Sequence, residues 1–149
     1  MEQILITDIP QEMMDKLVDL EIYINNIGIN MKLLELIRLR VAQINGCAYC
    51  IDMHYKILKH LNETDLRLSS LIIWEETTYF TDKEKALLHF TEAVTKLNTK
   101  TISNSNYKTM NTYFSKSEII FITLAITHIN TWTRLMRTFK IEAGNYKVH

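Results

Sequence analysis

Residues that form turns are scarce in this sequence, and that scarcity limits the fold more than any other feature. The 149 residues include three glycines and one proline. A β-sandwich or barrel needs a turn every few residues, and glycine and proline are the residues that turns use most. The sequence therefore argues against an architecture of many short strands and favours long helices.

Helix start and stop signals divide the chain into six or seven helical segments. The expected helices span residues 10–26, 31–44, 47–61, 65–74, 82–97, 104–114 and 116–139, of which 104–114 has the weakest pattern. Four starts carry a side chain that caps free backbone N–H groups: Asn30, Thr64, Thr81 and Ser115. At Thr81 and Ser115 a glutamate follows three residues later, which completes a capping box. No repeat or linker separates the segments, so we expect a single compact all-α domain over residues 1–149.

Composition and charge exclude several classes of partner. Hydrophobic residues make up 47% of the chain and charged residues 23%, as in an ordinary globular protein. Seventeen basic residues balance seventeen acidic ones, so no net field favours nucleic acid or an anionic membrane. Residues 1–11 lack the pattern of a signal peptide, and the apolar run 119–129 is about half the length of a membrane span. We therefore expect a cytoplasmic protein with no membrane or nucleic-acid partner.

The expected helix 47–61 carries the residues of greatest chemical interest. Cys47 and Cys50 form a C-x-x-C pair, and in the cytosol this spacing indicates redox or metal chemistry. Cys47, Cys50 and His54 fall at helical spacing, on the same face as Leu58. We expect this face to point inward, with both thiols in the first turn of the helix at the edge of the core.

The spacing to His54 distinguishes the two cysteines. The positive end of a helix lowers a thiol pKa by only about one unit, and burial acts in the opposite direction. His54 lies four residues after Cys50, where side chains on a helix meet at roughly 5–6 Å between Cβ atoms. From Cys47 it is about 10.5 Å away along the axis. We therefore assign Cys50 as the nucleophile and Cys47 as the resolving thiol.

Glu35 is the third candidate. It lies in the segment 31–44, which is apolar almost all round, so its carboxylate is expected near the interior. Beside a thiol it would raise the pKa of that thiol, whereas beside His54 it can orient and charge the imidazole. The simpler alternative is an ion pair between Glu35 and Arg38, three residues later on the same helix.

The pattern Glu35-x11-Cys47-x2-Cys50-x3-His54 and the stretch 39–50 resemble the AhpD-like alkylhydroperoxidases within the carboxymuconolactone decarboxylase family. The similarity extends to residues 74–76, 80–86 and 124–130 and covers nearly the whole chain. The resemblance implies an all-α fold that assembles as dimers, trimers or hexamers. It implies a peroxidase in which Cys50 becomes a sulfenic acid, Cys47 resolves it to a disulfide, and Glu35 and His54 relay protons. It also implies a dithiol reductant, which is a lipoyl-bearing protein in the best-known branch. We expect no cofactor and no bound metal.

One departure from that pattern supports a second interpretation. Tyr49 precedes the second cysteine, where the peroxidase branch often carries histidine. The chain could therefore be a redox sensor or disulfide-exchange protein of the same fold that does not turn over peroxide. A third interpretation is a metal site built from Cys47, Cys50, His54 and Glu35, although the chain has no second C-x-x-C pair.

The remaining candidates have structural interpretations. We expect His60, His89 and His128 to be structural residues and His149 to be a free tail residue. Trp74, Tyr79 and Phe80 either line a substrate entrance or pack in the core. The apolar run within 119–129 exceeds what one groove can cover, and we expect part of it to form an oligomer interface.

Overall fold

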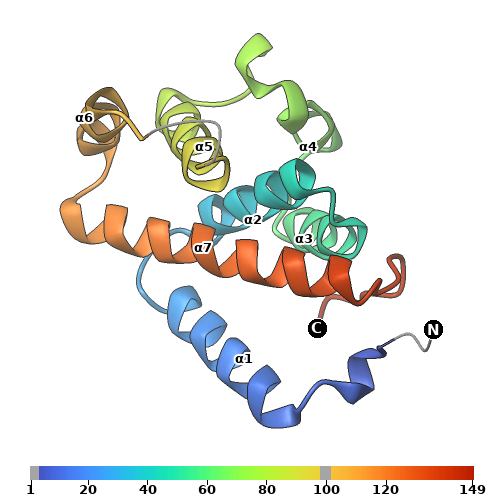
Figure 1. The fold of residues 1–149 in the computed structure, drawn as a ribbon. Helices are drawn as coiled ribbons and strands as arrows, with labels where there is room; N and C mark the ends of the chain where they lie inside the picture. The colour runs from blue at the N-terminus through green and yellow to red at the C-terminus, as the bar shows by residue number, and fades with distance from the viewer. Residues whose placement is uncertain (1–3, 98–101) are drawn as a thin grey trace.

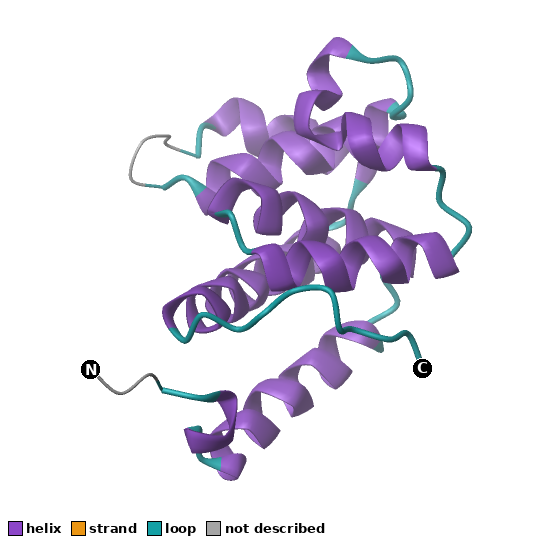
Figure 2. Cartoon of the chain, turned by 90° about the vertical axis from the view of Figure 1, so that its right-hand side faces the viewer, coloured by secondary structure: helices purple, strands orange, loops and turns teal. Residues whose placement is uncertain are grey.

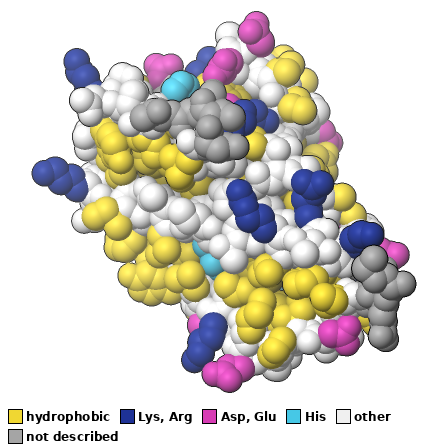
Figure 3. Space-filling model, viewed as in Figure 1, with side chains coloured by type: hydrophobic (Ala, Val, Ile, Leu, Met, Phe, Trp, Pro, Cys, Tyr) yellow, Lys and Arg dark blue, Asp and Glu magenta, His cyan; other side chains and the backbone are white. Residues whose placement is uncertain are grey.

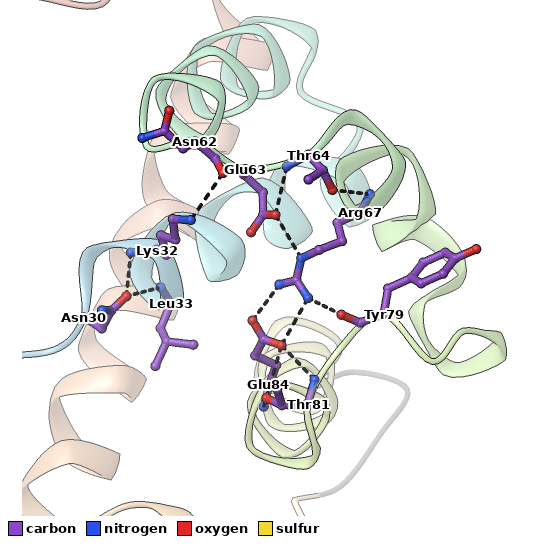
Figure 4. Close-up of polar contacts among 10 residues, drawn as sticks. All are labelled: Asn30, Lys32, Leu33, Asn62, Glu63, Thr64, Arg67, Tyr79, Thr81 and Glu84. Atoms are coloured by element: carbon purple, nitrogen blue, oxygen red, sulfur yellow. Dashed lines mark hydrogen bonds and ion pairs between the residues drawn. The ribbon is translucent and has the colours of Figure 1, made fainter.

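The central helix of the molecule begins at Asn30. In the computed structural model, which describes residues 4–97 and 102–149, the side chain of Asn30 accepts hydrogen bonds from the backbone N–H groups of Lys32 and Leu33 (Figure 4). Helix α2 (Met31–Asn45) follows and ends at Gly46, whose φ of 64° is the left-handed conformation that favours glycine. Residues 34–42 of α2 are all buried, as its apolar sequence predicts.

The other helices surround α2. They are α1 (Gln11–Asn25), α3 (Ala48–His60), α4 (Asp65–Ser70), α5 (Asp82–Thr95), α6 (Asn104–Tyr113) and α7 (Lys116–Thr138). Two short 3₁₀ helices, η1 (Ile6–Asp8) and η2 (Leu71–Glu76), complete the secondary structure of the described residues, which contain no strand (Figure 2). The long helix α7 crosses the molecule with α2, α3 and α5 on one side and α1 on the other (Figure 1). The prediction of a single all-α domain with six or seven helices is confirmed, and the described residues form seven α-helices.

Two apolar clusters hold these helices together. The larger joins α2, α5 and α7 through residues such as Leu34, Ile37, Val41, Leu87, Phe90, Ile122 and Ile126. The smaller joins α2 and α3 to α4, η2 and α5 through Leu36, Leu39, Leu58, Leu68, Leu71, Trp74, Phe80 and Leu88. Residues of α2 belong to both clusters, so packing on two faces of this helix fixes its position.

The capping box that begins α5 also attaches α4. The backbone N–H of Glu84 donates to Oγ1 of Thr81, and the Glu84 carboxylate accepts from the backbone N–H of Thr81. Arg67 of α4 donates to the same carboxylate, to Glu63 and to the carbonyl oxygen of Tyr79 (Figure 4). The predicted helix start is confirmed, and its glutamate also anchors the neighbouring helix.

The segment after Thr64 departs from the prediction. Thr64 caps a helix as expected, but α4 ends at Ser70 and the chain continues as the 3₁₀ helix η2 instead of an α-helix to Trp74. In a 3₁₀ helix residues three apart lie on one line along the axis. Leu71 and Trp74 both face the core in this way, whereas Ile73, which leaves helical geometry, is exposed.

Helix α7 is long and apolar enough to cross a bilayer by those two criteria alone. Core helices of globular proteins meet the same criteria, and the buried face of α7 packs against α2 and α5. The expectation that the chain has no membrane partner stays a prediction.

Candidate active site

A disulfide bond joins Cys47 and Cys50 at the start of α3. Cys47 is the residue that caps the helix, one position before the first turn in which the sequence placed it. Its Sγ accepts a hydrogen bond from the backbone N–H of Cys50, with an N···S distance of 3.3 Å. The two Cα atoms are 5.3 Å apart, which is within the usual range for a disulfide. The C-x-x-C pair is therefore able to form a disulfide within one helical turn.

The chain before α3 directs the pair into the protein. After the left-handed turn at Gly46, the backbone N–H of Cys47 donates to the carbonyl oxygen of Ala42, 3.0 Å away. The two cysteines then pack with Ala42 and with Met136 of α7, and they are only 1% and 3% exposed. Both sulfur atoms are consequently shielded from bulk solvent.

His54 lies one turn after Cys50 on α3 and contacts Glu35 of α2. Its Nδ1 is 2.7 Å from Oε2 of Glu35, and both residues are 2% exposed. An ionised carboxylate can only accept a hydrogen bond, so Nδ1 carries the donated proton. In the neutral imidazole, Nε2 is then left with its lone pair as the basic nitrogen. The structure thus brings together the two residues that the sequence proposed as a relay.

Arg38 binds the second oxygen of Glu35. Its Nη1 lies 2.6 Å from Oε1, so the carboxylate holds Arg38 and His54 at the same time. The two partners that the sequence offered as alternatives are both present. On its other side Arg38 donates to Oδ1 of Asn25 at 2.7 Å, and a carboxylate oxygen of Glu21 lies 3.9 Å away. A line of buried and half-buried polar groups therefore runs from α1 to His54.

The charge of Glu35 depends on these partners. Burial raises the pKa of the Glu35 carboxyl, because desolvation disfavours the charged form. The attraction and hydrogen bonds of His54 and Arg38 outweigh that effect and hold its pKa below the ordinary value of 4.5. Glu35 is therefore ionised near neutral pH, as its orienting role requires.

A cavity of about 320 Å³ opens beside Cys50 and His54, and both residues line it. The rest of its wall is mostly apolar and comes from η1, α1, α3, α7 and the C-terminal segment, including Met14, Val18, Met53, Ile129, Trp132 and Tyr146. Larger hollows exist, such as the one of about 470 Å³ between α5 and α6, but no cysteine lines that one. In the cavity beside Cys50, the reactive side chains of Cys50 and His54 lie next to an apolar wall that can bind a substrate.

Two aromatic side chains of this wall, Trp132 and Tyr146, each carry a polar atom. Nε1 of Trp132 is buried and is the one such side-chain nitrogen or oxygen in the described part of the chain without a hydrogen-bond partner. The pKa of Tyr146 is raised by burial and by the nearby Glu35, so its hydroxyl stays protonated. Lys56 of α3 holds the Tyr146 segment in place by donating to the carbonyl oxygens of Gly144 and Tyr146.

The sequence profile of the carboxymuconolactone decarboxylase family matches residues 11–93, a range that includes Glu35, Cys47, Cys50 and His54. The chain belongs to the carboxymuconolactone decarboxylase family. An uncharacterized relative, YdfG from Bacillus subtilis strain 168, is 33% identical over 138 residues, which are 93% of this chain and 91% of YdfG. Family membership and the resemblance read from the sequence therefore agree.

Solved structures share the fold. A protein of unknown function from Agrobacterium tumefaciens, provisionally assigned as the antioxidant defence protein AhpD, is 32% identical. It superposes with a TM-score of 0.92, and the match covers 98% of this chain and 100% of that one. The debrominase Bmp8 superposes with a TM-score of 0.81 at 15% identity, covering 91% of this chain and 73% of its own. At that identity the likeness to Bmp8 concerns the fold alone.

The other residues that the sequence suggested as candidates do not line the cavity beside Cys50. His128 is buried, and its Nε2 donates to the carbonyl oxygen of Leu17 at 3.0 Å. Trp74 donates to Glu92 at 2.8 Å and packs in the smaller core cluster with Phe80, while Tyr79 is exposed. His89 contacts Asn106, and His60 is exposed. None of these residues lines the cavity beside Cys50.

The described residues do not form a group of side chains that could serve as metal ligands. Across residues 4–97 and 102–149, no three His, Cys, Asp or Glu side chains are arranged to hold a metal ion. The sulfur atoms of Cys47 and Cys50 are bonded to each other, and Glu35 is occupied by His54 and Arg38.

Sequence reasoning missed two residues of the site, Trp132 and Tyr146, and the full role of a third, Arg38. Arg38 was considered only as a competitor of His54, although its position in an apolar helix signalled a buried charge that needs partners. Trp132 and Tyr146 lie more than 80 residues after the cysteines, and no local pattern connects them to the pair.

Proposed function

We propose that the protein is a thiol-dependent peroxidase that reduces hydroperoxides through a Cys47/Cys50 sulfenic acid–disulfide cycle. One observation carries the proposal: Cys50 and His54 line the same cavity, while an ionised Glu35 holds His54. A thiol, a base and a residue that orients the base form the arrangement that activates cysteine nucleophiles. Family membership and the relative from Agrobacterium tumefaciens support the same reaction class.

The first half of the cycle oxidises Cys50. His54 Nε2 takes the proton of the Cys50 thiol, and the thiolate attacks the terminal oxygen of the hydroperoxide. The O–O bond breaks, Cys50 becomes a sulfenic acid, and the alkoxide leaves with the proton from His54 as an alcohol. Glu35 stabilises the imidazolium that forms between these two proton transfers.

The second half forms the disulfide. The Cys47 thiolate attacks Sγ of Cys50, and the sulfenic oxygen leaves as water after taking a proton. The backbone N–H of Cys50 points at Cys47 Sγ, and the N-terminal end of α3 favours negative charge there. A dithiol reductant, as the resemblance to lipoyl-dependent relatives implies, then restores both thiols.

A redox sensor or disulfide-exchange protein is the second candidate, and Tyr49 is the observation that favours it. Tyr49 lines the cavity at the position where peroxidase relatives often carry histidine. A sensor forms the Cys47–Cys50 disulfide reversibly, but its steady-state consumption of peroxide is negligible. Sustained turnover excludes it.

We also propose a homo-oligomer in the cytoplasm. Apolar side chains gather over α1 and the adjacent face of α7 in the lower part of Figure 3. Ile22 and Tyr23 of α1 and Ile120 of α7 are more than half exposed. A second copy of the chain is the simplest cover for this surface. Light scattering of the wild type and of Ile120→Asp tests it, since the substitution is expected to lower the mass to that of the monomer.

The peroxidase proposal is tested by dithiol-dependent consumption of an organic hydroperoxide. Wild type is expected to turn over many times, whereas Cys50→Ser is expected to be inactive. Without the dithiol, Cys47→Ser is expected to consume one equivalent of hydroperoxide and to stop as the Cys50 sulfenic acid, because no second cysteine in the chain can convert it to a disulfide. Full activity of Cys50→Ser contradicts the assignment.

A further inference from the structure

The C-terminal segment after α7 is held against α3. Lys56 of α3 donates from Nζ to the carbonyl oxygens of Gly144 and Tyr146, at 3.1 and 3.0 Å. The backbone N–H of Gly144 donates to Oδ2 of Asp52, and Lys56 pairs with Asp52 at 2.7 Å. Gly144 has a φ of 102°, which favours glycine, and the segment turns back beneath the end of α7 (Figure 1). These contacts fix Tyr146 in the wall of the cavity beside Cys50.

The side chain of Tyr146 brings a free hydrogen-bond donor to this cavity. Across residues 4–97 and 102–149 its hydroxyl forms no hydrogen bond, and it is not fully buried. Nε1 of Trp132 also lacks a partner, but it is buried, so a ligand cannot reach it unless the side chain moves. Burial and the negative charge of Glu35 raise the pKa of Tyr146, so the phenol stays protonated and able to donate.

We propose that the Tyr146 hydroxyl donates a hydrogen bond to the carbon-bound oxygen of a hydroperoxide in the cavity. This proposal deepens the proposed function, and only the part that Tyr146 plays in the reaction rests on that function. When the Cys50 thiolate attacks the terminal oxygen, the O–O bond breaks and its electron pair goes to the carbon-bound oxygen. His54 supplies the proton that makes this oxygen an alcohol. Tyr146 keeps its own proton and stabilises the negative charge that develops there.

The composition of the cavity wall explains why a phenol is needed. The wall contains no lysine or arginine, so apart from His54 a leaving oxygen can be stabilised only by neutral donors. The charge of Glu35, which holds His54, acts on Tyr146, so this phenol lies near the pair that handles the proton. Tyr49 is the other phenol of the wall, but it belongs to α3 and packs against the cluster of Cys47 and Met136.

Binding of a product alcohol tests this donor without any peroxide. Cumyl alcohol is what cumene hydroperoxide leaves, and cumene is the matched molecule without the hydroxyl. Both are titrated into the disulfide forms of the wild type and of Tyr146→Phe and followed by NMR. Tyr146→Phe is expected to bind the alcohol about fivefold more weakly and cumene within about twofold of the wild type, because one neutral hydrogen bond is lost. An unchanged affinity for the alcohol, an equal loss for both molecules, or a wild type that does not bind the alcohol overturns the inference.

The reaction with cumene hydroperoxide tests the part that Tyr146 plays in the chemistry. In the Cys47→Ser background, loss of the Cys50 thiol gives the oxidation rate, and alkylation by iodoacetamide, in which no oxygen leaves, gives the reference. Tyr146→Phe is expected to slow oxidation about ten- to hundredfold and to leave alkylation within about twofold. A loss confined to Tyr49→Phe assigns the donor to that residue and overturns the inference. A Cys50 that does not react with hydroperoxide even beside Tyr146 refutes the proposed function instead, and the binding of cumyl alcohol then decides the inference alone.

Lys56 is the positioning residue for this hydroxyl, and a double-mutant cycle tests that role. Lys56→Met is expected to slow oxidation of Cys50 about fivefold or more, and Lys56→Met/Tyr146→Phe to be no slower than Tyr146→Phe, because the hydroxyl that Lys56 positions is already absent. Lys59→Met is the control, since Lys59 pairs with Asp65 on the exposed surface, and it should leave the rate within about twofold. Losses that multiply in the double variant, or a Lys56→Met rate equal to the control, contradict the role of the segment.

Discussion

Replacing Glu35 tests how much its buried contacts with Arg38 and His54 stabilise the fold. Comparing the effect on unfolding free energy with the effect on peroxide consumption distinguishes a structural role of Glu35 from a chemical one. Glu35→Gln keeps the shape of the side chain but removes the charge that Arg38 and His54 share. Arg38 is 3% exposed and is then left with Asn25 and with a Glu21 oxygen 3.9 Å away. Removing one partner of a buried ion pair costs about 3–5 kcal/mol. We expect the free energy of unfolding to fall by that amount, out of a total of about 5–15 kcal/mol.

A second substitution should restore most of the loss. Arg38→Met in the Glu35→Gln background removes the stranded cation, and replacing a whole buried ion pair by neutral groups is often close to neutral. We expect the double variant to unfold within about 1–2 kcal/mol of the wild type. Its peroxide consumption should stay as low as that of Glu35→Gln, because His54 still lacks its carboxylate.

Urea unfolding of the disulfide form, followed by circular dichroism, measures the stability of Glu35→Gln, of Arg38→Met and of the double variant. Lys59→Met is the control, because Lys59 forms its ion pair with Asp65 on the exposed surface, and it should change the stability little. A loss in Glu35→Gln no greater than in the control refutes the account of a strongly coupled buried charge. So does a double variant whose loss equals the sum of the two single losses.

Three further substitutions give separate outcomes. Gly46→Ala should cost about 1 kcal/mol of unfolding free energy, because the φ of 64° is unfavourable for alanine while the added Cβ has no neighbour nearer than 4.0 Å; an unchanged melting temperature contradicts this. Burial lowers the pKa of His128 from 6.5, so protonation favours the unfolded chain and the wild type should lose stability as pH falls below 6.5. This group contributes at most about 1.4 kcal/mol per pH unit, and His128→Gln should flatten that slope in urea titrations; identical slopes contradict the assignment. Tyr49→His should raise peroxide turnover about tenfold or more by adding a second proton-transfer group, and an unchanged steady-state rate counts against a role for this position.

The helices were predictable because their signals are local. Asn30, Thr81 and Ser115 cap helices through backbone groups two or three residues away, and the sequence alone displays that spacing. The shared inward face of Cys50 and His54 follows from helical periodicity in the same way. Such contacts depend little on how the rest of the chain folds.

The remaining parts of the site depend on tertiary packing. Arg38 meets Asn25 and Glu21 only because the end of α1 lies beside the middle of α2, and Trp132 reaches the cavity only because α7 lies beside α3. The switch from α4 to η2 likewise reflects the burial of Trp74 against Glu92, 18 residues later. No periodic pattern within a single helix specifies these contacts.

We expect hydroperoxide to oxidise Sγ of Cys50 and not Sγ of Cys47. Single-cysteine variants should be treated with one equivalent of an organic hydroperoxide in the presence of dimedone, which traps sulfenic acids, and then analysed by mass spectrometry. A dimedone adduct is expected on Cys50 in Cys47→Ser, and none is expected on Cys47 in Cys50→Ser. An adduct on Cys47 that forms at a comparable rate, or an unlabelled Cys50, contradicts this expectation.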